Sequence, residues 1–356
     1  MKKTILLTLL TSLITCANAQ RHEIYDPNIK SLQVVAGQNW MSLPVIKLRG
    51  NSPNDIINIG FDDLTHSYHR YVYKIEHCNA DWTVSDQLFT SDYIEGFADG
   101  STIDDNEESI NTNVLYTHYK LRIPNEDCQL KMSGNYKLTV YDENDNNRRV
   151  FTACFMVLEP QMGLQLSVTT NTDLDFNKAH QQVSMQLSYG NINVTDPTSQ
   201  IKTAVMQNGR WYNAKLNAKP QYIMPNGLYW DGKNYNVYPF MCEPRLNYVY
   251  DEDANGAFYI RNSDNIENDI SSEYVFVHYR LKCPQKVNGT VYLNATWTND
   301  WFTPDYQMTY NDATLCYEAT IMQKQGYYSY QLVMLDNSGT SDVYKRQLRY
   351  CADHAY

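Results

Sequence analysis

Apolar and polar residues alternate with a period of two along much of this chain. The alternation is clearest in four stretches, which are residues 136–141, 183–189, 274–281 and 291–297. One face of each stretch is apolar or aromatic, and the other face is mostly polar. Because successive side chains of a strand point to opposite faces, this period predicts half-buried β-strands.

Short runs rich in Asn, Asp and Gly separate the predicted strands and are typical of hairpin turns. They are residues 142–147, 253–256, 288–289 and 335–339. No amphipathic helix of about twelve residues or more is evident. The chain has 30 tyrosines, a residue that packs well on pleated sheets. We therefore expect an all-β fold of tandem β-sandwich domains, of the immunoglobulin or early-set type.

Two proline-containing junctions interrupt the alternation and predict domain boundaries. One is Glu159-Pro160, and the other surrounds Pro284. Each expected domain has a size suited to one β-sandwich. The domains are residues 20–159, 160–283 and 284–356.

The start of the chain has the three parts of a secretory signal peptide, which we assign to residues 1–19. Two lysines precede a short apolar run, and small residues up to Ala19 form the cleavage site, so that Gln20 begins the mature chain. Cys16 leaves a lipoprotein signal as an alternative. The apolar run is shorter than the ~20 residues of a transmembrane helix, so we expect an exported chain without direct membrane insertion.

Charge and cysteine content narrow the function classes. The formal net charge is −11, which disfavours binding to nucleic acid. The cysteines have no CxxC spacing, and both buried thiols and one or two disulfides remain open. No motif for a nucleotide, flavin or metal cofactor is present, so we expect no cofactor. The cysteines after the signal are Cys78, Cys128, Cys154, Cys242, Cys283, Cys316 and Cys351.

The stretch HCNADW, residues 77–82, raises the question of thiol chemistry. A catalytic Cys–His pair needs the two groups within hydrogen-bond reach of each other. His77 and Cys78 follow an alternating strand and are expected to point to opposite faces. We therefore expect a structural role, in which His77 hydrogen-bonds at the strand edge and Cys78 packs as a small apolar group. Asn79 and Asp81 would shape a turn, and Trp82 would cover the core.

Three other stretches contain residue types that can bind metal ions. Residues 251–256 read DEDANG and resemble the start of a calcium loop, but Asn262 stands where that loop needs a bidentate glutamate. A tight hairpin is the better interpretation. The acidic run at 104–108 is more typical of a solvated loop. His66 and His69 would face opposite ways on a strand. We expect no metal site.

Several ordered blocks of sequence resemble the Plug protein family of the type IX secretion system of Bacteroidota. The resemblance implies a periplasmic, non-enzymatic subunit of β-sandwich domains. It also implies that the protein binds the outer-membrane translocon barrel and closes its periplasmic mouth. Residues 235–253 and the tail from about residue 340 depart from the family pattern. The matching blocks are residues 25–34, 71–88, 93–125, 133–146, 155–160, 207–211, 253–258, 273–281 and 325–330.

Two surfaces are candidates for binding. The acidic loop at 96–111 is poorly explained as core, and our interface candidates there are Tyr93, Gly96, Phe97 and Gly100. The third domain resembles glycogen-binding early-set modules, which leaves carbohydrate binding as an alternative function. Its candidate residues are Trp297, Trp301 and Tyr328, although such aromatics more often pack within a small sandwich.

Overall fold

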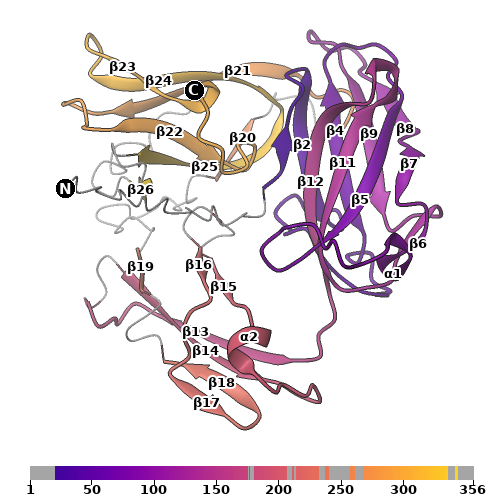
Figure 1. The fold of residues 1–356 in the computed structure, drawn as a ribbon. Coiled ribbons are helices and arrows are strands. Elements are labelled where there is room, and N and C mark those ends of the chain that lie inside the picture. Colours follow the sequence, from indigo (N-terminus) through magenta and orange to yellow (C-terminus); the bar gives the residue numbers. More distant parts are fainter. Residues whose placement is uncertain are drawn as a thin grey trace, which may run out of the picture.

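The computed structural model describes residues 21–335, apart from 175, 177–179, 207–210, 212–213, 232–236, 240–256 and 261–267, and also residues 341–343. Its strands fall into three groups along the chain, which we name the first module (residues 23–158), the second module (163–239) and the third module (257–343) (Figure 1). The predicted cleavage site at Ala19 and Gln20, the turn at 253–256 and the tail beyond residue 343 lie outside the described residues.

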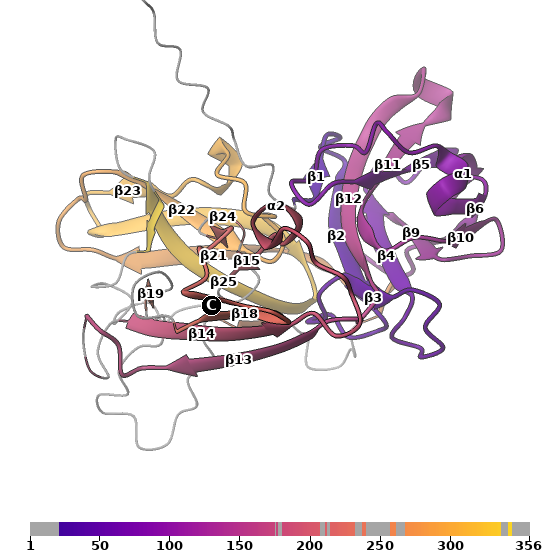
Figure 2. The ribbon, with the colours of Figure 1, turned by 60° about the horizontal axis from the view of Figure 1, so that its bottom comes forward.

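The first module is a sandwich of two sheets, which are antiparallel apart from one parallel strand pair, β3 with β12, within one of them (Figures 1 and 2). One sheet has the order β1 (Glu23–Ile24), β12 (Arg148–Leu158), β11 (Gly134–Asp142), β5 (Tyr71–Cys78) and β7 (Asp99–Thr102), with β3 (Val45–Lys47) beside β12. The other has the order β2 (Ile29–Ala36), β4 (Ile57–Asp63), β9 (Thr117–Ile123) and β8 (Asp105–Glu108). The pair β6 (Ile94–Gly96) and β10 (Cys128–Leu130), the helix α1 (Thr90–Tyr93) and the 3-10 turn η1 (Glu143–Asp145) complete the module.

The core of the first module lies between its two sheets. On β11 the alternating residues Tyr136, Leu138 and Val140 are fully buried, as the period-two pattern predicts. Phe61 of β4 stacks on Tyr119 of β9, with ring centroids 5.1 Å apart. Large aromatic rings contribute much of the apolar area that such a core removes from water. This module therefore provides a rigid scaffold for the loops at its ends.

The second module is built on one antiparallel sheet. Its order is β13 (Gly163–Thr169), β14 (His180–Ser188), β18 (Gly227–Trp230) and β17 (Tyr222–Met224), with β19 (Val237–Pro239) also paired to β14. A short pair, β15 (Ala204–Val205) and β16 (Lys215–Leu216), and the helix α2 (Pro197–Gln200) lie against it. Val183, Met185 and Trp230 are buried in its small core.

The third module has two further sheets. One contains β20 (Ala257–Ile260), β25 (Gly326–Leu335), β22 (Thr290–Ala295) and β26 (Ser341–Val343). The other contains β21 (Tyr274–Lys282), β24 (Cys316–Lys324) and β23 (Thr309–Asn311), and the 3-10 turn η2 (Pro304–Tyr306) precedes β23. Val277, Tyr279, Leu281, Val291 and Leu293 face the core between them.

The pairing of β21 bears on the predicted boundary at residue 283. The sequence places residues 274–281 at the end of the second domain, whereas β21 pairs along its whole length with β24 of the third module. β20 likewise pairs with β25. This pairing favours a boundary before β20. We retain three domains as a proposal, with this earlier boundary between the second and the third.

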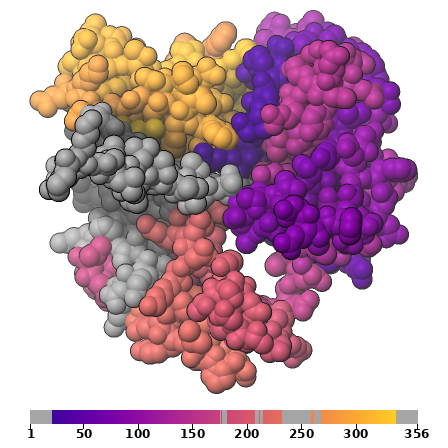
Figure 3. Space-filling model, viewed as in Figure 1, coloured from indigo at the N-terminus to yellow at the C-terminus, as the bar shows by residue number. Residues whose placement is uncertain are grey.

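The all-β prediction is confirmed, because the described helices are single turns and sheets make up the three modules. Within the described part of the chain, no helix has the length and apolar composition needed to cross a membrane. In the space-filling view, the third module (yellow) lies directly against the first (indigo), above the second (Figure 3).

Candidate interaction site

The HCNADW stretch forms the end of β5 and the turn that follows it. His77 is directly opposite Tyr136 on β11, and their rings meet edge to face at 5.1 Å. Its Nδ1 lies 2.9 Å from the Ser85 hydroxyl, and its Nε2 lies 3.2 Å from the carbonyl of Ser133. Both ring nitrogens therefore have partners inside the fold, and the imidazole fixes the chain on either side of it.

Cys78 lies on the other face of β5 and is 1% exposed. Burial raises the pKa of its thiol to about 11. A reactive cysteine needs a lowered pKa and access to solvent. The geometry therefore separates the imidazole from the thiol and keeps the thiol protonated, which argues against nucleophilic chemistry at this site.

The rest of the stretch makes a closed turn. The amide of Trp82 donates to the carbonyl of Asn79 at 2.9 Å, and the Asp81 carboxylate accepts from the Thr83 hydroxyl at 2.6 Å. Trp82 has a left-handed backbone, with φ of 65°, and its side chain is buried. Its ring meets Trp211 of the second module edge to face at 6.3 Å. The turn thus lies where the first and second modules meet.

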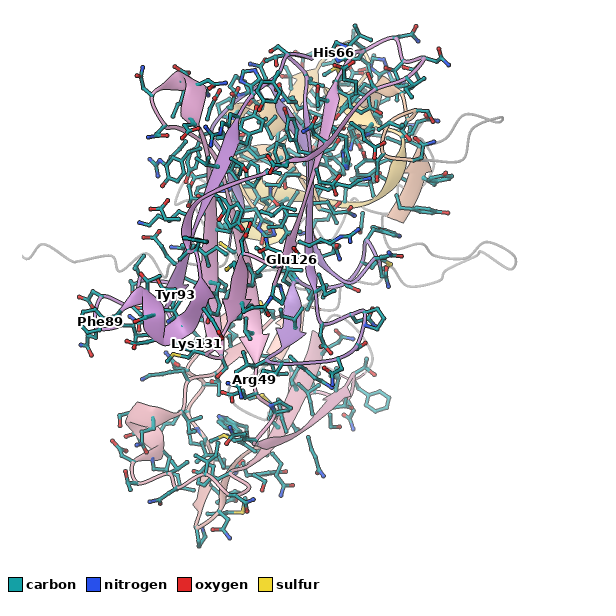
Figure 4. The ribbon with its side chains drawn as sticks, turned by 90° about the vertical axis from the view of Figure 1, so that its right-hand side faces the viewer. Arg49, His66, Phe89, Tyr93, Glu126 and Lys131 are labelled. Atoms are coloured by element: carbon teal, nitrogen blue, oxygen red, sulfur yellow. The ribbon has the colours of Figure 1, made fainter. Side chains whose placement is uncertain are left out.

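The next segment projects from the first module and displays two large aromatic rings. Phe89 is 79% exposed and Phe97 is 66% exposed. Phe89 precedes α1, and Phe97 follows β6, so the two residues flank one compact element. In Figure 4, Phe89 lies at the outer side of the module, beyond Tyr93 and at the opposite end from His66. We name residues 89–97 together with β10 the aromatic projection.

Hydrogen bonds hold the aromatic projection in place. The Asp92 carboxylate accepts from the Phe89 amide at 2.9 Å, which caps α1. The Phe97 amide donates to the carbonyl of Asp127 at 2.8 Å. Lys131 donates from Nζ to the carbonyl of Ser91 at 2.7 Å. The two exposed rings are therefore presented on an ordered backbone, which lowers the conformational entropy that binding would cost.

The predicted interface residues divide into different roles. Tyr93 is only 7% exposed, and its ring packs at 5.6 Å from His77 and 6.1 Å from Tyr136. This corrects the expectation that Tyr93 is an exposed anchor, because α1 turns its ring into the core. Phe97 is exposed as expected.

Gly96 and Gly100 both have positive φ, at 99° and 83°. A Cβ atom on Gly96 would lie 2.1 Å from the carbonyl oxygen of Asp127, so only glycine fits against β10. Gly100 has nothing within 4 Å of such an atom. Gly96 therefore shapes the aromatic projection, whereas Gly100 lies at the irregularity in the pairing of β7 with β5.

The stretch expected to be an acidic loop contains two strands. β7 pairs with β5, and β8 pairs with β9, so each forms an edge of one sheet. Pairing with the neighbouring strand overrides the low strand propensity of the Asp and Glu residues. The side chains of β8 are exposed, and acidic residues on an edge strand also discourage pairing with other chains.

Phe89 was not among the sequence candidates. It lies directly before α1, where it is the N-cap residue, and its ring is 79% exposed. The signal that could have found it is the Thr-Ser-Asp sequence directly after Phe89, which is typical of the first turn of a helix.

The candidates for carbohydrate binding pack against protein. Trp297 meets Tyr328 edge to face at 5.3 Å and contacts the core of the third module. The Tyr328 hydroxyl donates to the carbonyl of Lys324 at 2.7 Å. Trp301 donates from Nε1 to the carbonyl of His22 at 2.9 Å, and Arg21 lies over its ring at 5.0 Å. A sugar platform needs an open ring face, so this packing disfavours the alternative function.

His66 and His69 take part in polar networks and not in a metal site. His69 lies 2.8 Å from Asp142 through Nδ1, and His66 lies 3.3 Å from the carbonyl of Tyr116. Among the described residues, no group of three or more His, Cys, Asp or Glu side chains could hold a metal ion. The described cysteines are buried thiols, not disulfides, and they are Cys78, Cys128, Cys154, Cys283 and Cys316.

Comparisons with known proteins agree with this architecture. A family model described as "Type 9 secretion system plug protein 1st domain" matches residues 29–159, which is most of the first module. A solved structure, the crystal structure at 2.30 Å resolution of a hypothetical protein from Parabacteroides merdae ATCC 43184, is 33% identical with a TM-score of 0.83. The match covers 92% of this chain and 91% of that chain. Among curated proteins, none matches the chain.

Proposed function

The chain belongs to the type IX secretion system plug protein family, and from this premise we propose that it binds the outer-membrane translocon barrel and closes its periplasmic opening. A role in the type IX secretion system, at an extracytoplasmic location, follows from the family. The barrel as the partner, the periplasmic side and the association with the outer membrane are the parts that we propose.

The observation that carries the proposal is the position of the aromatic projection. Phe89 and Phe97 lie within residues 29–159, the part of the chain that the family model matches. Exposed aromatic side chains on an ordered backbone are typical of the residues that dominate protein–protein binding energy. The proposed mechanism is occlusion, in which a folded β-sandwich docks by shape and excludes solutes from the pore. Such a mechanism needs no bond-making step, so we propose a non-enzymatic protein.

The test is a double substitution, Phe89→Ala with Phe97→Ala, in the exported chain. We expect co-purification of the barrel from outer membranes to fall at least about tenfold, because anchors of this kind contribute about 1–2 kcal/mol or more each. Tyr68→Ala is the matched control, since Tyr68 is 75% exposed on the same module but outside the aromatic projection. Circular dichroism should show that all variants are folded.

Two outcomes distinguish a failure of the proposed function from a failure of the proposed binding site. If the wild-type chain does not co-purify with the barrel, the proposed function is wrong. If it does, and the double variant binds equally well, only the assignment to the aromatic projection is wrong. A deletion of the chain should also raise the permeability of the outer membrane to a small dye, and the wild-type chain should reverse this.

A further inference from the structure

A buried carboxylate joins the first and third modules. Asp62 lies on β4 of the first module and has no exposed surface. Its Oδ1 lies 2.6 Å from Nδ1 of His118 on β9. Its Oδ2 accepts from the Tyr274 hydroxyl at 2.7 Å and lies 2.8 Å from Nζ of Lys324. Tyr274 and Lys324 belong to the third module, so one carboxylate binds two side chains from the other side of the interface.

We propose that Asp62 is the centre of a releasable ionic latch between the first and third modules. The inference goes beyond the proposed docking function, because it concerns the relative movement of two modules of this chain. It does not depend on which protein the aromatic projection binds.

Lys324 is the third module's main contribution to the latch. Its Nζ also donates to the carbonyl of Asp269 at 2.7 Å and lies 4.1 Å from the centre of the Tyr116 ring. The side chain is 9% exposed. Burial lowers the pKa of Lys324, while Asp62 favours its charged form. A charge so far from water is stable only while its partner is present.

A second set of contacts surrounds the latch. Lys120 of the first module pairs with Asp269 at 2.8 Å. The Ile110 amide donates to the carbonyl of Ile270 at 2.8 Å, and the Asn113 amide donates to the Glu273 carboxylate at 2.9 Å. These two amides belong to the first module and their acceptors belong to the third, so each reports directly on whether the interface is closed.

The type of contact explains why the latch can open. In the described residues, every strand pair lies within one module, so separating the first and third modules breaks no sheet. Buried ion pairs give a specific geometry but little net stability, because both charges regain water when they separate. An apolar interface of the same size would have no such compensation. The ionic contacts at Asp62 therefore fix the geometry of the interface but add little to the free energy needed to open it.

A second connection keeps the two modules together when the latch opens. The start of the described chain passes along Trp301 of the third module, whose Nε1 donates to the carbonyl of His22. The His22 ring in turn accepts from the Cys154 amide of β12 at 3.0 Å. This connection is formed by residues far in sequence from Asp62. When the contacts at Asp62 open and those at Trp301 remain, the third module pivots relative to the first.

The test measures hydrogen exchange at the Ile110 and Asn113 amides in the mature full chain. We expect Lys324→Met to speed exchange at both by about tenfold or more, because it removes the cation beside the buried Asp62 carboxylate, which keeps only its contacts with His118 and Tyr274. Tyr274→Phe removes one hydrogen bond to Asp62 and should speed it by a smaller factor. Tyr279→Phe is the control, since its hydroxyl bonds Gln323 inside the third module. It should leave both amides unchanged.

Two results would overturn the latch. In the first, both Lys324→Met and Tyr274→Phe leave exchange at Ile110 and Asn113 at the wild-type rate. In the second, the rates rise only together with those of the core strands β11 and β12, which reports unfolding of the first module. Should Lys324→Met not fold, Tyr274→Phe decides alone. Adding Asp62→Asn to Lys324→Met should slow exchange again, because the buried carboxylate that lost its cation is then neutral.

Discussion

His77 and Cys78 are neighbours in sequence, but their side chains leave β5 on opposite faces. The imidazole packs against Tyr136 and bonds the Ser85 hydroxyl, whereas the thiol sulfur lies 3.9 Å from the carbonyl of Glu76. A stretch that reads as a possible thiol site is therefore part of a strand end. Its role is to fix the turn that carries Trp82 toward the second module.

The first prediction concerns the reactivity of Cys78. Because burial raises its pKa to about 11, about one thiol in a thousand is ionised at pH 8. We expect iodoacetamide to label Cys78 at least about a hundredfold more slowly in the folded chain than in urea. Mass spectrometry of tryptic peptides measures this. Rapid labelling of the folded chain at neutral pH would instead support thiol chemistry.

The second prediction concerns pH and His22. Burial lowers the pKa of His22 to about 4, so the neutral ring is favoured in the folded chain. Its contribution to stability is complete above the unfolded value of about 6.5 and is lost as pH falls from there toward 4. We expect the loss between pH 7 and pH 4.5 to be on the order of 2 kcal/mol, because this interval includes most of the gap between the two pKa values.

Urea unfolding of the mature chain at pH 7 and at pH 4.5 measures this effect. His22→Gln cannot take up the proton and should show a smaller loss between the two pH values. His278→Gln is the control, because His278 is exposed and bonds only Thr320 at the surface of the third module. An equal loss in all three proteins would assign the pH dependence to other groups.

The strands were predictable because their signal is local. Tyr136, Leu138 and Val140 alternate with polar residues, and the structure buries each of them in the first module. Alternation identifies a strand but not its partner. Residues 274–281 were correctly expected to form a strand, yet its pairing with β24 depends on contacts with a segment about forty residues later.

The candidate site was only partly predictable for a related reason. Phe97 was a candidate because the acidic loop that contains it is poorly explained as core. Tyr93 lies in the same segment, but its ring is buried. The pairing of β6 with β10 turns α1 toward His77, and this contact is not visible in the sequence. The role of Asp62 could not be predicted either, because its partners Tyr274 and Lys324 come from the third module. A period in the sequence cannot identify contacts between modules.

The third prediction compares Gly96, which belongs to the aromatic projection, with Gly100, which belongs to the neighbouring strand β7. Gly96→Ala places a Cβ atom 2.1 Å from the Asp127 carbonyl and also strains a φ of 99°. Gly100→Ala strains a φ of 83° but meets no atom within 4 Å. We expect Gly96→Ala to lower the free energy of unfolding by about 2–4 kcal/mol and Gly100→Ala by about 1 kcal/mol.

Urea unfolding distinguishes the two glycine variants, and barrel binding adds a second measurement. Because Phe97 directly follows Gly96, the Gly96→Ala variant should also bind the barrel less tightly at a temperature where it is folded. Gly100→Ala should bind as the wild type does. Equal stability of the two variants would show that β10 moves to accept the added methyl group.

The last prediction separates a structural role of Trp301 from carbohydrate binding. Trp301→Ala removes the hydrogen bond to the His22 carbonyl and the contact with Arg21. We expect it to lower the free energy of unfolding by about 2 kcal/mol or more, because a half-buried indole and its partner both lose contacts. Phe276→Ala is the control, since Phe276 is 68% exposed on the same module. It should change stability by less than about 0.5 kcal/mol.

A fluorescence titration of the wild-type chain with a panel of polysaccharides completes this test. Because Arg21 lies over the Trp301 ring and the His22 carbonyl accepts from its Nε1, we expect no saturable quenching. Saturable quenching that Trp301→Ala abolishes, with its stability unchanged, would restore the carbohydrate-binding function. Quenching that persists in Trp301→Ala would place any sugar site elsewhere. A flat titration with a destabilised variant assigns Trp301 to the contact between the first and third modules.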